Sequence, residues 1–181
     1  MQPQEGKSAP LREIAVPSVR VLMPSPIGSL GVELTGSAVT RLRIEPNEPL
    51  RSTFTPLHQI SGSDFLDEVF GRLSEYFAGA RRKLDLMFDL GPCGLPGLAR
   101  RVLREAAKIP YGRTRTYQAL ADGIGALDTD RQVLAVLHAN PIPIFIPCHR
   151  VVDRTGTGGY VGGAERKRWL LELERQDEEL S

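Results

Sequence analysis

A stretch rich in glycine and proline, GPCGLPG at residues 91–97, constrains the fold of this chain more than any other feature. Five of its seven residues are glycine or proline. Proline lacks the backbone donor that helices and sheets need, and glycine loses the most freedom in either, so regular structure rarely continues through such a stretch. We therefore expect a domain boundary here. One domain would span residues 20–91 and a second residues 92–181, after a flexible, polar leader over residues 1–19.

The residues before this boundary predict a small antiparallel sheet. Apolar residues alternate over residues 30–34 and again over 39–44, with Gly36 between the two runs, which predicts a β-hairpin. Residues 46–62 contain several prolines and polar residues and are expected to form a loop.

The period of the apolar residues then changes. Seven apolar residues between positions 65 and 77 recur at helical spacing, with Asp64 available as the N-cap and Gly79 as the stop. The segment KLDLMFDL at residues 83–90 alternates again and is expected to form one more strand. Together these elements predict a small α/β domain before the boundary.

The pattern after the boundary is mainly helical. Helices are expected over residues 98–108, 116–125, 128–140 and 164–176, the second capped by Thr116 and the third by Asp128 or Thr129. The prolines of residues 141–147 are expected to hold the chain extended, and residues 153–163 to form a glycine-rich loop. The chain is therefore expected to be an α+β protein, with a small N-terminal α/β domain and a helical C-terminal domain.

Two of these helices, separated by GIGAL at residues 123–127, have the outline of a helix-turn-helix. In that motif the second helix enters a groove of DNA. The same spacing occurs in helical hairpins that pack only for their own core, and spacing alone favours that reading. Asp128 and Asp130 would repel DNA phosphates, whereas Arg131 and His138 would attract them, so the residues leave both readings open.

The charge of the chain is balanced overall but not along its length. The formal net charge is +1, whereas residues 92–160 hold 9 basic and 5 acidic side chains, a net charge of +4. This modest excess favours a phosphate-rich partner only weakly. No apolar run is long enough to span a membrane and no secretory signal is visible, so we expect a cytoplasmic protein, or a nuclear one in a eukaryote.

The stretch IFIPCHRVV at residues 144–152 places a thiol, an imidazole and a guanidinium side by side. The two cysteines and three scattered histidines of the chain form neither a disulfide framework nor a zinc pattern, so we expect a reducing compartment and no metal. A thiolate is a strong nucleophile, and a histidine can take its proton directly or through a water. The alternative for Cys148 is a buried structural thiol, but the adjoining His149 and Arg150 are costly to bury without partners.

Four segments together resemble the O6-alkylguanine-DNA alkyltransferases, also called methylated-DNA–protein-cysteine methyltransferases. They are SPIGSLGVELTGSAV from residue 25, IPYGRTRTYQALA from residue 109, NPIPIFIPCHRVV from residue 140 and GYVGGAERKRWLLELE from residue 159. The resemblance covers residues 21–175, and the PCHRV segment, whose cysteine stands eight residues after Asn140, is its most specific part.

The resemblance implies a DNA repair protein that reacts once per molecule. Members of this family bind duplex DNA from the minor-groove side with a helix-turn-helix, flip an O6-alkylguanine out of the stack and move its alkyl group to a cysteine. The implied partner is double-stranded DNA that carries O6-alkylguanine. No cofactor, metal, membrane or obligate protein partner is implied, and we expect a monomer.

The positions that match the family motif carry implied roles. Cys148 matches the alkyl acceptor, His149 the base that deprotonates it through a water, and Glu174 the carboxylate that orients this base. Asn140 matches the residue that braces the network, and Tyr117 the tyrosine that helps to rotate the nucleotide and donates to the departing base. The other matched positions are implied DNA contacts and walls of the base pocket. The DNA contacts are Arg131, which would fill the gap in the stack, Thr116, Gln118 and Gln132, and the pocket walls are Pro143, Val151, Tyr160, Val161 and Gly162.

The match is weakest on the helix that carries Arg131. The family usually has small residues there, whereas this chain has Asp130, Gln132 and Leu134, and bulk and negative charge on a groove-facing helix should weaken DNA contact. Val161 also replaces a serine that is common beside the pocket tyrosine. Two other functions therefore stay open. One is a lesion sensor that binds without transferring alkyl groups, although such relatives replace the cysteine. The other is a cysteine hydrolase of acyl substrates.

Overall fold

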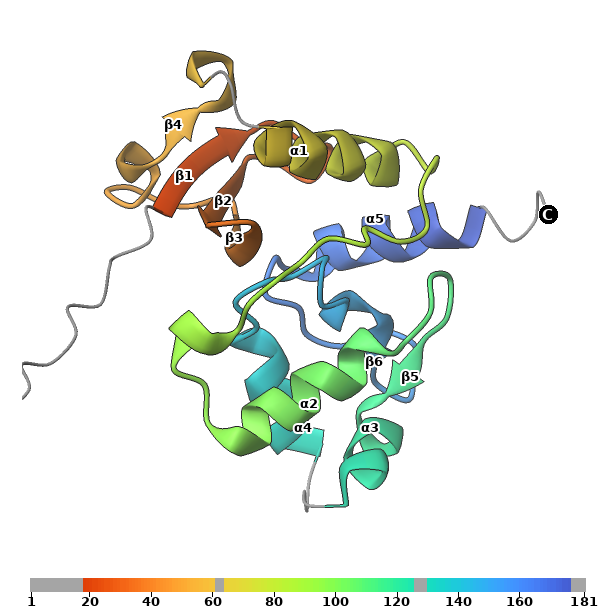
Figure 1. The fold of residues 1–181 in the computed structure, drawn as a ribbon. Coiled ribbons are helices and arrows are strands. Elements are labelled where there is room, and N and C mark those ends of the chain that lie inside the picture. Colours follow the sequence, from red (N-terminus) through yellow and green to blue (C-terminus); the bar gives the residue numbers. More distant parts are fainter. Residues whose placement is uncertain (1–17, 61–63, 126–129, 177–181) are drawn as a thin grey trace, which may run out of the picture.

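The computed structural model describes residues 18–60, 64–125 and 130–176, and its N-terminal part contains a four-stranded sheet (Figure 1). The sheet order is β3-β2-β1-β4. Strands β1 (Ser18–Met23), β2 (Leu30–Thr35) and β3 (Ala38–Ile44) are antiparallel neighbours, and the short β4 (Thr55–Pro56) pairs parallel to β1. The predicted hairpin, formed by β2 and β3, is confirmed.

The structure differs from the expectation at two places in this part. Ser18 and Val19 form the start of β1 and pair with β2, whereas the sequence placed them in a flexible leader; residues 1–17 lie outside the described part. The loop predicted over residues 46–62 contains β4 and two short 3-10 helices, Arg51–Thr53 and Leu57–Gln59. A strand of two residues and single helical turns leave no period in the sequence, so pattern analysis does not detect them.

Helix α1 (Asp64–Phe77) packs on the sheet and forms where the apolar spacing predicted it. Its buried residues form one helical stripe: Leu66, Val69, Phe70, Leu73, Tyr76 and Phe77. Gly79 follows the helix with a φ of +74°, and its N–H bonds to the Tyr76 carbonyl oxygen at 3.0 Å. Glycine adopts this left-handed conformation at little cost, which explains why the helix ends here.

The strand predicted over residues 83–90 is wrong. Only one bridge forms, between Val39 and Phe88, and it rests on hydrogen bonds from Val39 to Met87 and from Asp89 to Val39. Asp85 has a φ of +47°, which turns the chain, and Met87 is 71% exposed. The segment crosses from α1 to the C-terminal part instead of extending the sheet (Figure 1).

The C-terminal part is mainly helical, as expected. Helix α2 (Gly97–Ala107) packs against α3 (Tyr117–Ile124) and α4 (Asp130–His138), and α5 (Ala164–Gln176) lies between these helices and α1 (Figure 1). The Thr116 hydroxyl accepts a hydrogen bond from the Ala119 N–H at 3.1 Å, so the predicted cap of α3 is confirmed. The predicted caps of α4, Asp128 and Thr129, lie outside the described residues.

Two short strands that the sequence did not predict connect the helices to the segment after the cysteine. Strand β5 (Arg115–Thr116) pairs in parallel with β6 (Val151–Val152). This pairing ties the start of α3 to the chain directly behind the CHR segment.

Hydrogen bonds and apolar contacts join the two parts of the chain. The Leu42 N–H donates to the Pro141 carbonyl oxygen at 2.8 Å, and Arg166 Nε donates to the Ile27 carbonyl oxygen at 2.6 Å. The buried apolar residues of both parts form one core cluster. Within the part of the chain that the structure describes, no helix is long and apolar enough to cross a membrane. The same residues contain no group of three or more His, Cys, Asp or Glu side chains that could hold a metal ion.

Candidate active site

The segment before the cysteine is a closed turn, so the extended path predicted over residues 141–147 is wrong. The Ile146 N–H bonds to the Ile142 carbonyl oxygen at 2.9 Å, and Ile144 has a φ of +76°. The Asn140 side chain fastens the turn, because its Oδ1 accepts from the Ile142 N–H at 3.0 Å and its Nδ2 donates to the Ile146 carbonyl oxygen at 2.9 Å. An asparagine amide can replace backbone partners in this way, and here it outweighs the extended preference of the prolines.

Asn140 also donates a hydrogen bond to the thiol. Its Nδ2 lies 3.1 Å from the Cys148 Sγ, and both residues are buried. Cys148, His149 and Arg150 form one 3-10 turn, so their side chains do not alternate as they would on an extended strand. The turn therefore directs the thiol to Asn140 and the imidazole to Glu174.

His149 and Glu174 form a buried pair. Nε2 of His149 lies 2.9 Å from Oε1 of Glu174, and the two side chains are 0% and 1% exposed. An ionised carboxylate only accepts hydrogen bonds, so Nε2 carries the proton and Nδ1 keeps its lone pair. His149 Nδ1 is buried and has no hydrogen-bond partner among the described residues. Nδ1 is therefore the atom of this pair that can accept a proton.

Burial sets the protonation states of the thiol and the imidazole. Burial raises the pKa of Cys148 to about 11, although the hydrogen bond from Asn140 and the charge of Lys167 both act to lower this pKa. Burial lowers the pKa of His149, although the hydrogen bond and the charge of Glu174 act to raise it. At neutral pH the thiol is therefore protonated and the imidazole is neutral, which is the starting state for a proton transfer from sulfur to histidine.

Arg150 keeps the buried carboxylate ionised. Burial alone would raise the pKa of Glu174, but hydrogen bonds from His149 and from the Arg150 guanidinium outweigh burial and lower this pKa to about 2. Nε of Arg150 donates to Oε2 at 2.9 Å, and Nη2 donates to Oε1 at 2.8 Å. The Gly112 N–H adds a bond to Oε2 at 3.2 Å. Sequence reasoning assigned Arg150 no role, although a guanidinium beside the histidine signalled a need for a buried partner.

A buried lysine that sequence reasoning missed holds the glycine-rich loop. Lys167 Nζ donates to the carbonyl oxygens of Val151 at 2.7 Å and of Gly159 at 3.1 Å. The Tyr117 hydroxyl donates to the same Gly159 oxygen at 3.3 Å. Gly158 has a φ of +105°, and a Cβ there would lie 2.4 Å from the Tyr117 hydroxyl oxygen, so this position requires glycine. Tyr117 is thus held against the loop that follows the CHR segment.

Some of the predicted pocket residues border a cavity. Pro143 and Val161 share the wall of a cavity of about 300 Å³ with Asn140, whose amide contacts the thiol. Val151 does not line this cavity, because it is fully buried in β6 and belongs to the core.

Of the other predicted pocket residues, Tyr160 packs beside the imidazole and Gly162 lies against Tyr160. Tyr160 is buried, and its ring centroid lies 6.1 Å from that of His149. A Cβ on Gly162 would lie 2.8 Å from the Tyr160 ring, so only glycine fits beside this tyrosine. Cys148 is only 1% exposed. A molecule from solution therefore reaches the sulfur only when the residues around it move.

The predicted DNA contacts on the helix-turn-helix are polar and accessible in part. Arg131 and Gln132 are exposed in the first turn of α4, and Gln118 of α3 is exposed and donates to Asp122 at 2.7 Å. Leu134 is half-buried, and its Cδ1 lies 3.1 Å from where a Cβ on Gly159 would stand, so its bulk packs against the loop. The side chain of Asp130 lies outside the described part.

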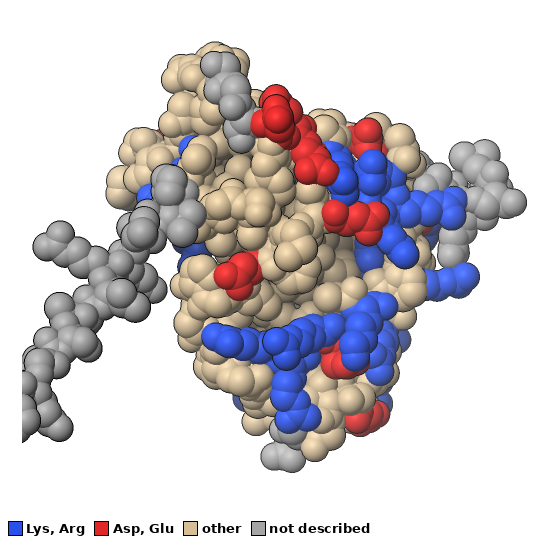
Figure 2. Space-filling view, in the orientation of Figure 1, with Lys and Arg blue, Asp and Glu red and all other residues tan. Residues whose placement is uncertain are grey.

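Basic side chains gather beside the helix-turn-helix. Figure 2 shows a row of Lys and Arg across the face on which α2 lies in Figure 1. The basic residues of α2 and its C-cap are Arg100, Arg101, Arg104 and Lys108. Because α2 packs against α3 and α4, part of the basic excess expected for residues 92–160 lies next to both helices.

Comparisons with known proteins agree with this geometry. A family described as "6-O-methylguanine DNA methyltransferase, DNA binding domain" matches residues 97–176. The methylated-DNA–protein-cysteine methyltransferase of Mycobacterium tuberculosis is 40% identical over 154 residues, which cover 83% of this chain and 88% of the relative. The enzyme of the same name from Mycobacterium leprae is 38% identical over 84% of this chain and 90% of its own.

Solved structures match over nearly the same range. The crystal structure of the Mycobacterium tuberculosis O6-methylguanine methyltransferase superposes with a TM-score of 0.75 at 38% identity, covering 88% of this chain and 94% of that one. A crystal structure of the same mycobacterial protein in complex with DNA gives a TM-score of 0.75 over 87% and 93% of the two chains. With this identity over most of both lengths, the chain belongs to the methylated-DNA–protein-cysteine methyltransferase family.

Proposed function

We propose that this protein repairs duplex DNA by moving the alkyl group of an O6-alkylguanine to the sulfur of Cys148, once per molecule. One observation carries the proposal. A thiol bonded to Asn140 stands next in the chain to a histidine whose Nε2 is held by a buried carboxylate and whose Nδ1 is left as an acceptor. The helix pair α3 and α4 lies in the same part of the chain.

The chemistry follows from the protonation states. His149 Nδ1 takes the thiol proton through a water, and the sulfur then attacks the alkyl carbon in line with its bond to O6. The carbon–sulfur bond forms as the carbon–oxygen bond breaks, and the electron pair of the broken bond stays on the guanine. The Tyr117 hydroxyl gives the guanine a proton. The proton held by His149 then returns through water to the Tyr117 oxygen, so that both side chains end neutral. Because the thiol has a pKa of about 11, the thiolate forms only as the base takes the proton.

The product explains the single turnover. A thioether offers water no easy leaving group, so the alkylated Cys148 is not regenerated. The other cysteine, Cys93, is half-buried and donates to the Thr40 carbonyl oxygen at 3.4 Å, in a different region of the protein. Each protein molecule is therefore expected to accept one alkyl group.

Access to the sulfur requires two movements. The target base has to leave the stack, which costs a few kcal/mol, because its alkyl carbon is out of reach inside a duplex. The residues that cover Cys148 also have to shift, since the thiol is 1% exposed. We propose that the exposed Arg131 enters the gap in the stack, where it recovers part of the first cost.

The test of this function uses a duplex with one O6-methylguanine. After incubation, mass spectrometry of the intact protein and of its Cys148 peptide should show one methyl group per molecule, and the DNA should contain guanine. Tight binding with an unmodified thiol would instead support the lesion sensor. Repeated turnover of a thioester with an unmodified thiol would support the hydrolase.

We expect Asp130→Ala to tighten DNA binding. Asp130 is the first residue of α4, and its negative charge should repel phosphates near Arg131. The expected gain is about fivefold at low salt, equivalent to about 1 kcal/mol, and it should shrink as salt screens the charge. Fluorescence anisotropy with an unmodified duplex at several salt concentrations measures this gain. Asp67→Ala, which removes an exposed negative charge from α1, is the control and should leave the binding curve unchanged.

A further inference from the structure

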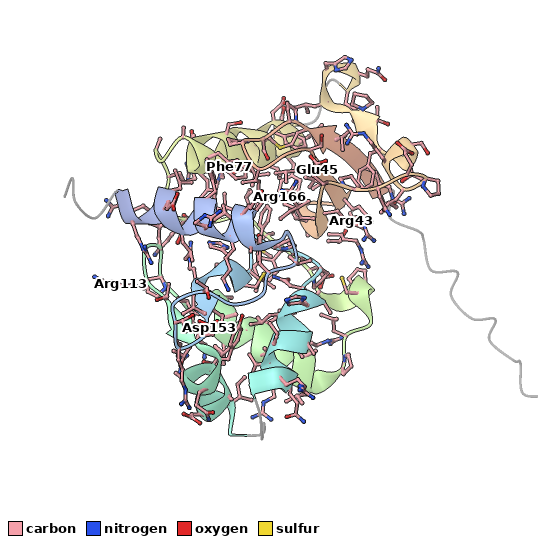
Figure 3. The ribbon with its side chains drawn as sticks, turned by 180° about the vertical axis from the view of Figure 1, so that it is seen from behind. Arg43, Glu45, Phe77, Arg113, Asp153 and Arg166 are labelled. Atoms are coloured by element: carbon pink, nitrogen blue, oxygen red, sulfur yellow. The ribbon has the colours of Figure 1, made fainter. Side chains whose placement is uncertain are left out.

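One buried group in contact with the site has no part in the reaction as described so far. The Tyr76 hydroxyl of α1 donates to Oε1 of Glu174 at 2.7 Å, and its oxygen lies 3.5 Å from Nε2 of His149. Tyr76 is 2% exposed. Its ring is held edge-on by Phe77 and Tyr111, with centroids 5.4 Å and 6.0 Å away. Figure 3, which labels Phe77, shows α1 lying along α5, the helix that carries Glu174.

We propose that Tyr76 is a positioning residue for alkyl transfer, whose hydroxyl fixes the Glu174 carboxylate and so keeps His149 oriented as the base. This inference rests on the proposed function. It also makes the N-terminal part of the chain a contributor to the active site, because Tyr76 is the residue that reaches the carboxylate from α1.

The arrangement around Oε1 supports this role. Oε1 accepts from Tyr76 at 2.7 Å, from Arg150 Nη2 at 2.8 Å and from His149 Nε2 at 2.9 Å. Three donors from two segments, α1 and the 3-10 turn, leave the oxygen little freedom to rotate away from the imidazole. The Arg150 guanidinium holds both carboxylate oxygens, but the imidazole bonds only to Oε1, where the tyrosine also binds. Among the described residues, the Tyr76 hydroxyl is the constraint on Oε1 that comes from outside the C-terminal part, and its loss would remove it.

A purely structural role does not require the hydroxyl. Phenylalanine would fill the same space between Phe77 and Tyr111, and it would avoid burying a polar group. The pKa of Tyr76 is raised by burial and by the charge of Glu174, so the hydroxyl stays protonated and acts as a donor. A buried hydroxyl that donates to an ionised carboxylate is a charge-assisted bond, which is stronger than a bond between neutral groups.

The hydroxyl also influences the basicity of the imidazole. The titratable and charged groups around His149 are Glu174 and Lys167 of α5, Arg150 and Cys148 of the 3-10 turn, Tyr160 of the loop, and Tyr76 of α1. Of these, Glu174 favours the protonated imidazole. A donor on Oε1 spreads part of the carboxylate charge, so its removal should strengthen the attraction between Glu174 and a protonated His149. The pKa of His149 would then rise, and more of the base would be blocked by its own proton at a given pH.

The test compares Tyr76→Phe with the wild-type protein in single-turnover methyl transfer at saturating duplex, over a range of pH. We expect the rate at neutral pH to fall about tenfold, the size of effect typical for loss of one hydrogen bond to a charged group. The acidic limb of the rate profile should move to higher pH. Affinity for an unmodified duplex should stay within about twofold of wild type, because Tyr76 is buried and belongs to α1, not to the helix pair α3 and α4.

Tyr111→Phe is the matched control. It removes a hydroxyl from the ring that packs against Tyr76, but this hydroxyl donates to the Leu173 carbonyl oxygen at 3.5 Å and not to the carboxylate. Both variants should lose some thermal stability, while only Tyr76→Phe should change the pH profile. If Tyr76→Phe loses stability yet transfers methyl groups at the wild-type rate and with the wild-type profile, Tyr76 serves the core alone and the proposal is wrong.

A second readout separates this inference from the proposed function. The imidazole nitrogen resonances of His149 in NMR report its tautomer and pKa in the free protein, without any DNA. We expect Tyr76→Phe to raise the pKa read from these resonances and Tyr111→Phe to leave it unchanged. A wild-type protein that transfers no methyl group, together with such a shift, would refute the function and keep the role of Tyr76 at His149. Transfer without any shift in either the resonances or the rate profile would refute the role of Tyr76 and keep the function.

Discussion

Cys148→Ala should yield a protein that never acquires an alkyl adduct, because the acceptor atom is gone. Incubation with an O6-methylguanine duplex should leave both the protein mass and the lesion unchanged. DNA binding should remain close to wild type, since the thiol is 1% exposed and lies outside the polar face of α4. The loss of transfer is read by mass spectrometry, and binding by anisotropy with the same duplex.

Cys93→Ala is the matched control for this change. Cys93 is the other free thiol, and its pKa is raised by burial, so both cysteines are protonated at neutral pH. Cys93→Ala should still take up one methyl group per molecule. A Cys148→Ala protein that loses DNA binding together with transfer would show that the cysteine has a structural role. A methyl adduct on Cys93 would show that Cys93, and not Cys148, is the alkyl acceptor.

Glu174→Gln should damage both the reaction and the fold. The neutral amide no longer balances the buried Arg150 guanidinium, and breaking a buried ion pair in this way costs about 3–5 kcal/mol of unfolding free energy. The amide can also turn an N–H toward His149 Nε2, which would favour the wrong tautomer. We expect the transfer rate to fall at least about a hundredfold, the lower range for loss of a working general base. Chemical denaturation and single-turnover transfer measure the two effects.

The pH dependence of stability gives an independent check on the same residue. The folded-state pKa of Glu174 is about 2, below the value of about 4.3 for an unfolded glutamate. A carboxylate whose pKa is lower in the folded state stabilises the fold fully at pH values above its unfolded-state pKa. This stabilisation is lost as the pH falls through the folded-state pKa. Wild-type stability should therefore decline from about pH 4 toward about pH 2, and Glu174→Gln should lack this component.

Glu172→Gln is the control for both measurements. Glu172 is exposed on the same helix two residues away, so the substitution makes the same change in charge without touching the buried network. Stability and transfer should stay at wild-type values. A Glu174→Gln protein that behaves like Glu172→Gln would mean that the carboxylate neither holds Arg150 nor orients the histidine.

Local patterns in the sequence were sufficient where one segment specifies its own structure. The apolar stripe of α1, the Thr116 cap of α3 and the hairpin of β2 and β3 were predicted because period and capping chemistry act over a few residues. Residues 83–90 show the limit of such patterns. Their alternation was read as a strand, but one bridge and a turn at Asp85 are what the surrounding structure permits.

The candidate site shows the same division. The CHR segment made Cys148 and His149 candidates for a reactive pair, and the family resemblance added Asn140, Tyr117 and Glu174 to the prediction. The sequence pattern predicted no role at the site for Lys167 or Tyr76. A lysine on an amphipathic helix is usually a surface charge, and a tyrosine at an apolar position is usually part of the core. Val151 is fully buried in β6, and its place at the base pocket stays a prediction.

The sequence by itself determined the five main helices, the hairpin of β2 and β3 and the residue types available for chemistry, since apolar period, capping and residue identity are properties of short stretches. Only the tertiary structure decided which buried groups meet. Tyr76 and Glu174 stand 98 residues apart in the chain, and Glu174 and His149 stand 25 apart. A buried charge needs a partner, because an unpaired charge in the interior costs too much free energy. Which residue becomes the partner depends on how whole helices and strands pack, and no pattern in a short stretch of sequence indicates that packing.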